Sequence, residues 1–111
     1  MSSMIAKALK RKAWPFDFNG QKIYLRAMSH KESREVAGVP EHLQGIYVLG
    51  CCEVDAAGVA VCGRSDGESL EEYLTRLESV YGDIDEPTFL ELAQMIEKVT
   101  KAPDVGKLEK N

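Results

Sequence analysis

The sequence lacks an apolar run of about 18 residues or more, the length that a membrane-spanning helix requires. Its basic N-terminus, with Lys7, Lys10, Arg11 and Lys12, is not followed by the apolar stretch of a secretion signal. We therefore expect a soluble intracellular protein that does not bind membranes.

Cysteine and histidine are scarce. Cys51 and Cys52 are adjacent, and Cys62 follows ten residues later. A zinc site requires cysteines two to four residues apart or histidines nearby, and neither His30 nor His42 has ligand spacing. Without a secretion signal, the three thiols are expected to be buried and unpaired. The sequence predicts no metal site and no cofactor.

Motifs of known catalytic sites are also missing: there is no H-E-x-x-H, no G-x-S-x-G and no Walker loop. The polar loop 63–68 lacks the lysine and the dense glycine pattern of a phosphate-binding loop. Glu71, Glu72 and Glu78 fall away from the apolar stripe of their predicted helix, so we expect them to be solvated. The sequence therefore predicts that the protein is not an enzyme.

Charge is divided unevenly along the chain, whose net charge is −4. Residues 1–35 hold eight Lys or Arg against three Asp or Glu, whereas residues 36–111 hold six against fifteen. An acidic chain argues against nucleic acid as the main partner, because phosphate binding requires a concentrated basic patch. The division indicates either an oligomer that joins unlike halves or simply two differently charged solvated faces.

The 111 residues predict one domain of the α+β class. Apolar residues alternate with polar ones over 14–25, and Asn19-Gly20 lies between the two arms. This pattern predicts an N-terminal β-hairpin with a type I′ turn. Trp14 and Phe16 are expected to pack in the core, and the alternative is that they are exposed binding anchors. Ser29 and Glu32 form a capping box that predicts a short charged helix to about residue 37.

The most apolar segment, residues 45–62, is predicted to form a central β-hairpin. Tyr47 and Val48 favour a strand, and Gly50 is unfavourable inside a helix. The alternative is a buried helix over 43–52, because a short apolar run has no decisive period. The predicted parts are a strand at Ile46–Val54, a turn at Asp55–Gly58 and a returning strand at Val59–Cys62. They follow a connection over 39–44 that is either irregular or contains one helical turn started by Pro40.

Two antiparallel amphipathic helices are predicted at the C-terminal end. The first begins after a capping box of Ser69 and Glu72 and ends at Gly82. The second begins at Asp85 or Glu86 and ends near Lys101. The apolar positions of the first are Leu70, Tyr73, Leu74, Leu77, Val80 and Tyr81, and those of the second are Phe89, Leu92, Ala93, Ile96 and Val99, with Leu90 and Met95 widening the stripe.

The domain organisation follows from these elements. Residues 1–13 form a basic segment with Ile5, Ala8 and Leu9 at helical spacing, which is either a short amphipathic helix or a frayed end. Residues 14–101 form a single globular domain. Residues 102–111, which begin just before Pro103, are expected to be a flexible polar tail.

The order of these elements resembles that of the tail assembly chaperones of long-tailed bacteriophages, over roughly residues 16–101. Two motifs carry the resemblance, one over the first hairpin and short helix and one at the central turn. Their residues are Leu25, Arg26, Ser29 and Glu32, and then Val54, Asp55, Gly58 and Val61.

This resemblance implies a homo-oligomeric protein of the bacterial host cytoplasm, encoded by a phage or prophage. It would bind the tape-measure protein, keep it soluble, recruit tail tube protein and be absent from the mature virion. The apolar positions Leu90, Met95, Tyr73 and Leu77 are the candidate partner-binding residues. The alternatives are a structural or connector protein that stays in the phage particle, and a generic intracellular adaptor domain.

Overall fold

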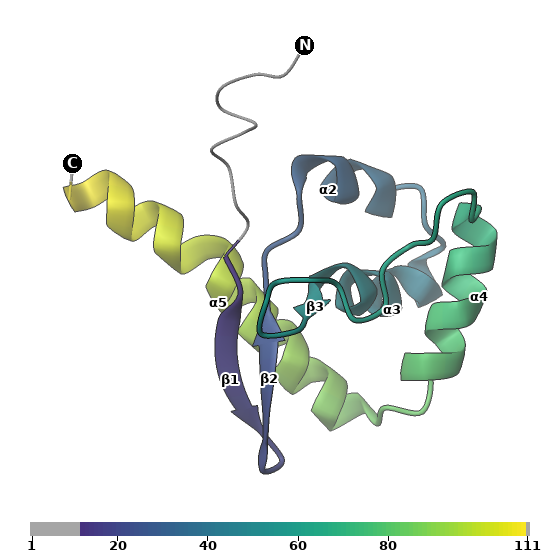
Figure 1. Cartoon of the computed structure of the whole chain (residues 1–111), viewed down its shortest axis with the longest axis horizontal. Helices are drawn as coiled ribbons and strands as arrows, with labels where there is room; N and C mark the ends of the chain where they lie inside the picture. The colour runs from purple at the N-terminus through teal and green to yellow at the C-terminus, as the bar shows by residue number, and fades with distance from the viewer. Residues whose placement is uncertain (1–11, 111) are drawn as a thin grey trace.

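The computed structural model describes residues 12–110, and it describes side chains for residues 12–100. The predicted basic segment 1–13 therefore lies almost wholly outside the described residues. The chain has α+β architecture, in which a small sheet lies beside the first helices and the last helix crosses behind the strands (Figure 1). The elements are β1 (Trp14–Phe18), β2 (Gln21–Leu25), α2 (His30–Val36), α3 (Glu41–Cys52), β3 (Glu53–Val54), α4 (Leu70–Tyr81) and α5 (Glu86–Lys110).

The N-terminal hairpin is confirmed. β1 and β2 pair antiparallel with Trp14 opposite Leu25, and β3 joins the other edge of β2. Asn19 and Gly20 both have positive φ, at 50° and 81°, as a type I′ turn requires. Phe16 packs against the core, as predicted, whereas Trp14 is half-buried and lies under the ammonium of Lys12 at 3.9 Å.

Both predicted capping boxes are present. The hydroxyl of Ser29 accepts a hydrogen bond from the N–H of Glu32, and the Glu32 carboxylate accepts one from the N–H of Ser29. Ser69 and Glu72 repeat this exchange at the start of α4. The predicted helix over 70–81 is confirmed, and the carboxylate of Asp85 caps α5 by accepting from the N–H of Thr88 at 2.9 Å.

The predicted strand over 46–54 is wrong, because this segment forms helix α3 and only Glu53 and Val54 are extended. The alternative of a buried helix is the correct one. In the connection over 39–44, the alternative of a helical turn started by Pro40 is the correct one, because Pro40 is the N-cap of α3. This helix is buried on several sides, so its apolar residues do not follow one stripe, and Tyr47, Leu49, Gly50, Cys51 and Cys52 are all buried.

Two glycines lie inside α3, although glycine disfavours a helix, because neighbouring helices pack closely against them. A Cβ atom on Gly50 would lie 2.6 Å from Cδ2 of Leu77 and 2.9 Å from the hydroxyl of Tyr73, both on α4. A Cβ atom on Gly45 would overlap the ring of Phe89, on α5. The glycines therefore lower helix propensity but open space for side chains of two neighbouring helices.

The second half of the predicted central hairpin is only partly correct. The turn at 55–58 is present: the Asp55 carboxylate accepts from the N–H groups of Ala57 and Val59 at 2.9 Å each, and Gly58 has a φ of 85°. The returning strand at 59–62 is reduced to a single bridge between Val54 and Ala60. The strand is short because β3 itself has only two residues.

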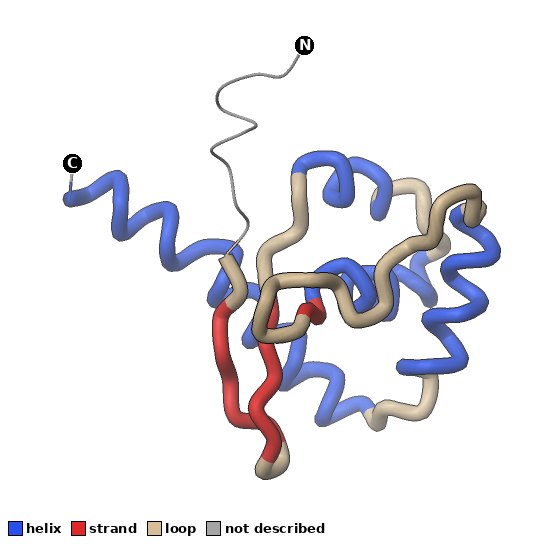
Figure 2. The backbone as a smooth tube through the Cα atoms, in the orientation of Figure 1, coloured by secondary structure: helices blue, strands red, loops and turns tan. Residues whose placement is uncertain are grey.

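The last two helices do not form the predicted antiparallel pair. They meet at the turn over residues 82–85 and then diverge, and α5 passes along the sheet (Figure 2). Helix α4 packs on α3, while α5 packs on α3 and β2, so α3 separates them. A short connection brings two helix ends together, but the packing surface offered by α3 decides the angle between them.

The predicted end of the last helix near Lys101 is also wrong. The α5 backbone stays helical through Pro103 to Lys110. Proline inside a helix removes one backbone donor and usually bends or ends it, and nothing in the described structure explains why the helix continues here.

We expect Gly50→Ala to destabilise the protein although alanine is the better helix former by about 1 kcal/mol. Leu77 is fully buried and cannot move aside, so the added methyl group overpacks the contact between α3 and α4, which typically costs about 1–3 kcal/mol. The gain in helix propensity offsets about 1 kcal/mol of this cost, so urea unfolding should give a net loss of up to about 2 kcal/mol. Gly38→Ala is the control, since its Cβ would meet only an ordinary contact at 3.6 Å. A Gly50→Ala protein that is more stable than the wild type by the full helix-propensity gain of about 1 kcal/mol would contradict this packing.

Candidate protein-binding surfaces

Three buried tyrosines use their hydroxyl groups to fasten other segments to the helical core. Tyr47 donates to the Glu35 carboxylate on α2 at 2.6 Å, and Tyr73 donates to the carbonyl of Cys62 at 2.9 Å. Tyr81 donates to the carboxylate of Glu53 on β3 at 2.6 Å. Burial and these neighbours raise the pKa of all three phenols, which therefore stay protonated as donors.

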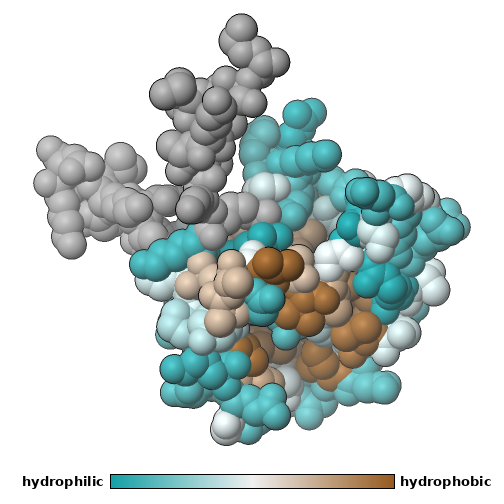
Figure 3. All heavy atoms as spheres, in the orientation of Figure 1, coloured by the Kyte–Doolittle hydropathy of each residue, from teal (hydrophilic) through white to brown (hydrophobic). Residues whose placement is uncertain are grey.

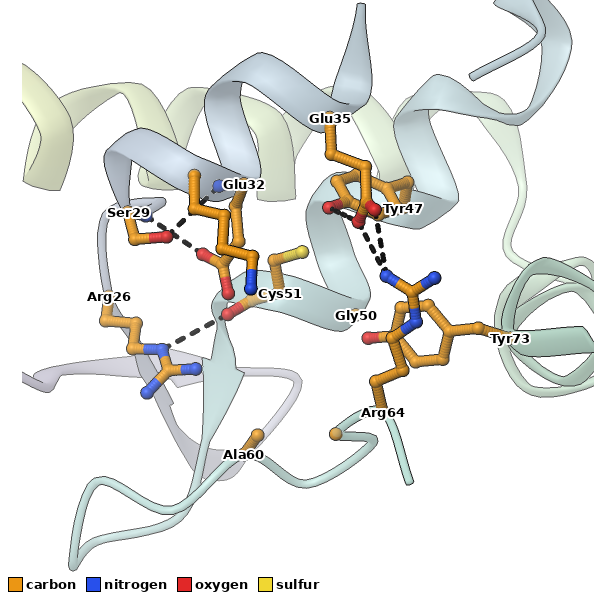
Figure 4. A pocket seen from close by; sticks show the side chains of 12 residues that line it. Arg26, Ser29, Glu32, Glu35, Tyr47, Gly50, Cys51, Ala60, Arg64 and Tyr73 are labelled. Carbon is orange, nitrogen blue, oxygen red and sulfur yellow. Dashed lines mark hydrogen bonds and ion pairs between the residues drawn. The ribbon is translucent and has the colours of Figure 1, made fainter. Parts of the chain in front are cut away.

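A cavity of about 330 Å³ lies between α2, α3 and the loop 55–69 (Figure 4). Arg64 spans its edge, and its guanidinium donates to both oxygens of Glu35 at 2.8 and 2.9 Å. The hydrogen bonds from Tyr47 and Arg64 lower the pKa of Glu35. On the opposite side, the guanidinium of Arg26 donates to the carbonyl groups of Cys51 and Gly58 at 3.2 and 3.4 Å.

The polar groups around this cavity therefore hold the chain together. Arg64 fastens the loop 55–69 to α2, and Arg26 fastens its beginning to the end of α3. The three cysteines form no disulfide, as predicted; Cys51 and Cys52 are buried and Cys62 is partly exposed. Among the described residues, no three His, Cys, Asp or Glu side chains are grouped as a metal site would require.

The loop 55–69 is also fastened to α4. The Arg76 guanidinium donates to both oxygens of Glu68 at 2.8 and 3.0 Å and to the carbonyl of Gly63 at 2.8 Å. The Glu68 carboxylate accepts a further bond from the N–H of Ser65 at 2.9 Å. Arg76 is the main reason why the pKa of Glu68 falls from 4.5 to about 2. The loop is thus attached at both ends and at its middle.

The ion pair between Arg76 and Glu68 makes the stability of the fold depend on pH. Because the folded pKa of Glu68 lies below its unfolded value, the stability linked to it is fully present above pH 4.5 and is lost as the pH falls towards 2. We expect wild type to unfold at a higher temperature than Glu68→Gln above pH 4.5, and the difference to shrink steadily between pH 4.5 and 2. Calorimetry at a series of pH values measures it. A difference that does not change over this range would show that the ion pair does not stabilise the fold.

The four candidate partner-binding residues lie in different environments. Tyr73 and Leu77 are 3% and 0% exposed, so both belong to the core that joins α4 to α3. Met95 is half-buried against that core. Leu90 is 55% exposed on α5. Leu90 is therefore the most accessible of the four, and replacing Leu77 would test packing before it tests binding.

Val59 and Val61 form a second exposed apolar surface, which the sequence pattern did not predict. They are 62% and 55% exposed, and they flank Ala60, which forms the bridge to Val54. Apolar residues gather on this face of the molecule, over the loop that follows β3 and in the space towards α4 (Figure 3). We call Val59 and Val61 the valine surface.

The valine surface is held rigidly. The N–H of Val61 donates to the carbonyl of Glu53 at 3.1 Å, and the carbonyl of Val59 accepts from the N–H of Asp55 at 2.8 Å. Arg26 holds the preceding turn through the carbonyl of Gly58. A surface whose backbone is already ordered loses little conformational entropy on binding, which favours association. The only sequence signal for this surface was the turn itself.

A groove of about 330 Å³ lies beside the turn between α4 and α5, on the side of the first residues of α3. The half-buried side chains of Ile46, Ile84 and Phe89 form its apolar lining. The exposed carboxylate residues Glu41, Glu78 and Glu86 also line it, and no lysine or arginine does.

No family model, curated protein or solved structure matches the chain. The helices in the described part of the chain are each too short or too polar to cross a membrane.

Proposed function

We propose that this protein is a tail assembly chaperone of long-tailed bacteriophages. It binds the tape-measure protein in the host cytoplasm, keeps it soluble, recruits tail tube protein and leaves before the virion is complete. The observation that carries the proposal is the valine surface, where Val59 and Val61 are exposed on a rigid loop within the second of the two motifs that resemble this family.

The valine surface suits a partner with an apolar stripe. A helical tape-measure segment exposes such a stripe when it is bare and would aggregate through it. Side chains that pack along a helix stripe exclude water and protect it from other copies of the same stripe. Leu90, on α5, offers a further exposed apolar contact.

One such contact is too weak to act alone. Burying the exposed half of two valines contributes roughly 1–3 kcal/mol, whereas association costs an estimated 4–15 kcal/mol or more in lost freedom of motion. A long partner with repeated stripes overcomes this deficit when it binds several copies of the chaperone, because each additional contact is then intramolecular. The proposal therefore requires the chaperone to act in multiple copies.

Co-expression with the tape-measure protein tests this function. Wild type should keep the tape-measure protein soluble and co-purify with it. Val59→Thr combined with Val61→Thr should reduce the recovered complex by at least about tenfold, because each valine contributes on the order of 1 kcal/mol and the loss multiplies over copies. Threonine keeps the shape of valine and its preference for extended backbone.

The matched control is Val80→Thr, which makes the same change at a residue that is 50% exposed on α4, outside the valine surface. It should leave co-purification unchanged. Equal losses for both variants would place binding elsewhere, and a tape-measure protein that stays insoluble with wild type would refute the chaperone function. Finding the protein in purified phage particles would instead support a connector.

A further inference from the structure

Arg26 differs from the two other arginines that hold the loop after β3. Arg64 and Arg76 each donate to both oxygens of a glutamate carboxylate. The half-buried Arg26 forms no ion pair with a carboxylate in the described part of the chain, and it donates only to two carbonyl groups, at 3.2 and 3.4 Å. A guanidinium has five N–H donors, so Arg26 keeps donors that no described residue accepts.

The cavity between α2, α3 and this loop lies against the guanidinium of Arg26. Figure 4 shows Arg26 at one side of the cavity and Arg64 at the other. Lys31 also lines the cavity; it is exposed and makes no ion pair or hydrogen bond with another described residue. Apolar groups contribute to the rest of the lining, and they belong to Gly50, Ala60 and Tyr73.

The charges around the cavity favour a ligand with a single negative charge. Three cations line it, Arg26, Lys31 and Arg64. The two carboxylates that line it, Glu32 and Glu35, leave an excess of one positive charge. A dianion such as phosphate would exceed this balance, whereas a carboxylate would neutralise it. The two oxygens of a carboxylate also match the planar fork of a guanidinium.

We propose that this cavity binds a carboxylate that carries an apolar group. Arg26 and Lys31 hold the carboxylate, and the apolar group lies against Ala60 and Tyr73. The cavity of about 330 Å³ is at the lower end of the range of small-ligand sites, about 300–1,000 Å³, which suits a group of the size of an amino acid. Such a carboxylate has two sources, a small organic acid and the C-terminal residue of a polypeptide.

The carboxylate site is independent of the proposed function. Arg26 and Lys31, which hold the carboxylate, do not belong to the valine surface. A failure of the carboxylate to bind would therefore leave the chaperone function standing, and a failure of the chaperone function would leave this site standing.

An NMR titration of the isotope-labelled full-length protein with N-acetyl-leucine tests the site, because this probe has one free carboxylate and one apolar side chain. The Nε–H signal of Arg26 and the amide signals around the cavity should shift with a millimolar dissociation constant. N-acetyl-leucinamide has the same apolar group without the charge, and it should bind at least about tenfold more weakly because a hydrogen bond between charged groups is lost. No response to millimolar N-acetyl-leucine, or equal affinities for the two probes, would overturn the proposal.

Two variants test the cations of the site. Lys31→Gln should weaken the binding of N-acetyl-leucine about two- to fivefold, the effect of one exposed charge pair. Its matched control is Lys22→Gln on β2, which makes the same change at an exposed residue outside the cavity and should bind like wild type. Arg26→Lys keeps the charge but loses the planar fork, so it should bind at least about tenfold more weakly. Equal affinities for Lys31→Gln and Lys22→Gln would contradict the site.

Isocaproic acid separates the two sources of the carboxylate. It has the carboxylate and the apolar group of N-acetyl-leucine but lacks the peptide bond. Similar affinities for the two acids would identify a small organic acid as the ligand, and an affinity at least about tenfold higher for N-acetyl-leucine would identify the C-terminal residue of a polypeptide. Both results support the site, whereas a protein that binds neither acid would refute it.

Discussion

The close approach of α4 and α5 to α3 is the constraint on which the rest of the structure depends. Gly50 makes room for the side chain of Leu77 on α4, and Gly45 makes room for the ring of Phe89 on α5, so both helices pack closely on α3. With α3 in the centre, its end sets the position of β3, and β3 completes the sheet. Substituting either glycine would force these helices apart. Because the loop that carries the valine surface joins β3 to α4, the two ends of this loop would then separate.

Signals that act over a few residues could be predicted from the sequence. The turn at Asn19-Gly20 and the cap at Ser69 depend only on groups three or four positions away, and both are present. The helix α3 could not be predicted with the same ease, because Gly50 makes room for Leu77, 27 residues later. The same limit applies to binding residues. An apolar stripe does not distinguish core from surface: Leu77, a predicted partner-binding residue, is fully buried, and the exposure of Val59 depends on which neighbours leave it uncovered.

In the proposed function, the weak contact made by the valine surface is repeated over several copies of the protein. The polar contacts of Arg26, Arg64 and Arg76 fix a long loop on three helices, and this order prepares two valines for binding. Two valines do not offset the cost of association, so affinity must come from several copies on one long partner. The uneven charge of the chain, basic before residue 36 and acidic after it, would favour such an array and also keep like surfaces apart.

Amide hydrogen exchange, compared between the protein alone and its purified complex with the tape-measure protein, tests the central claim most directly. The account predicts slower exchange in the loop 55–62 of the complex, where partner side chains cover the valine surface, and little change in α3, which is already buried. A complex in which the loop exchanges as fast as in the free protein would contradict it, because the partner would then be bound through another surface.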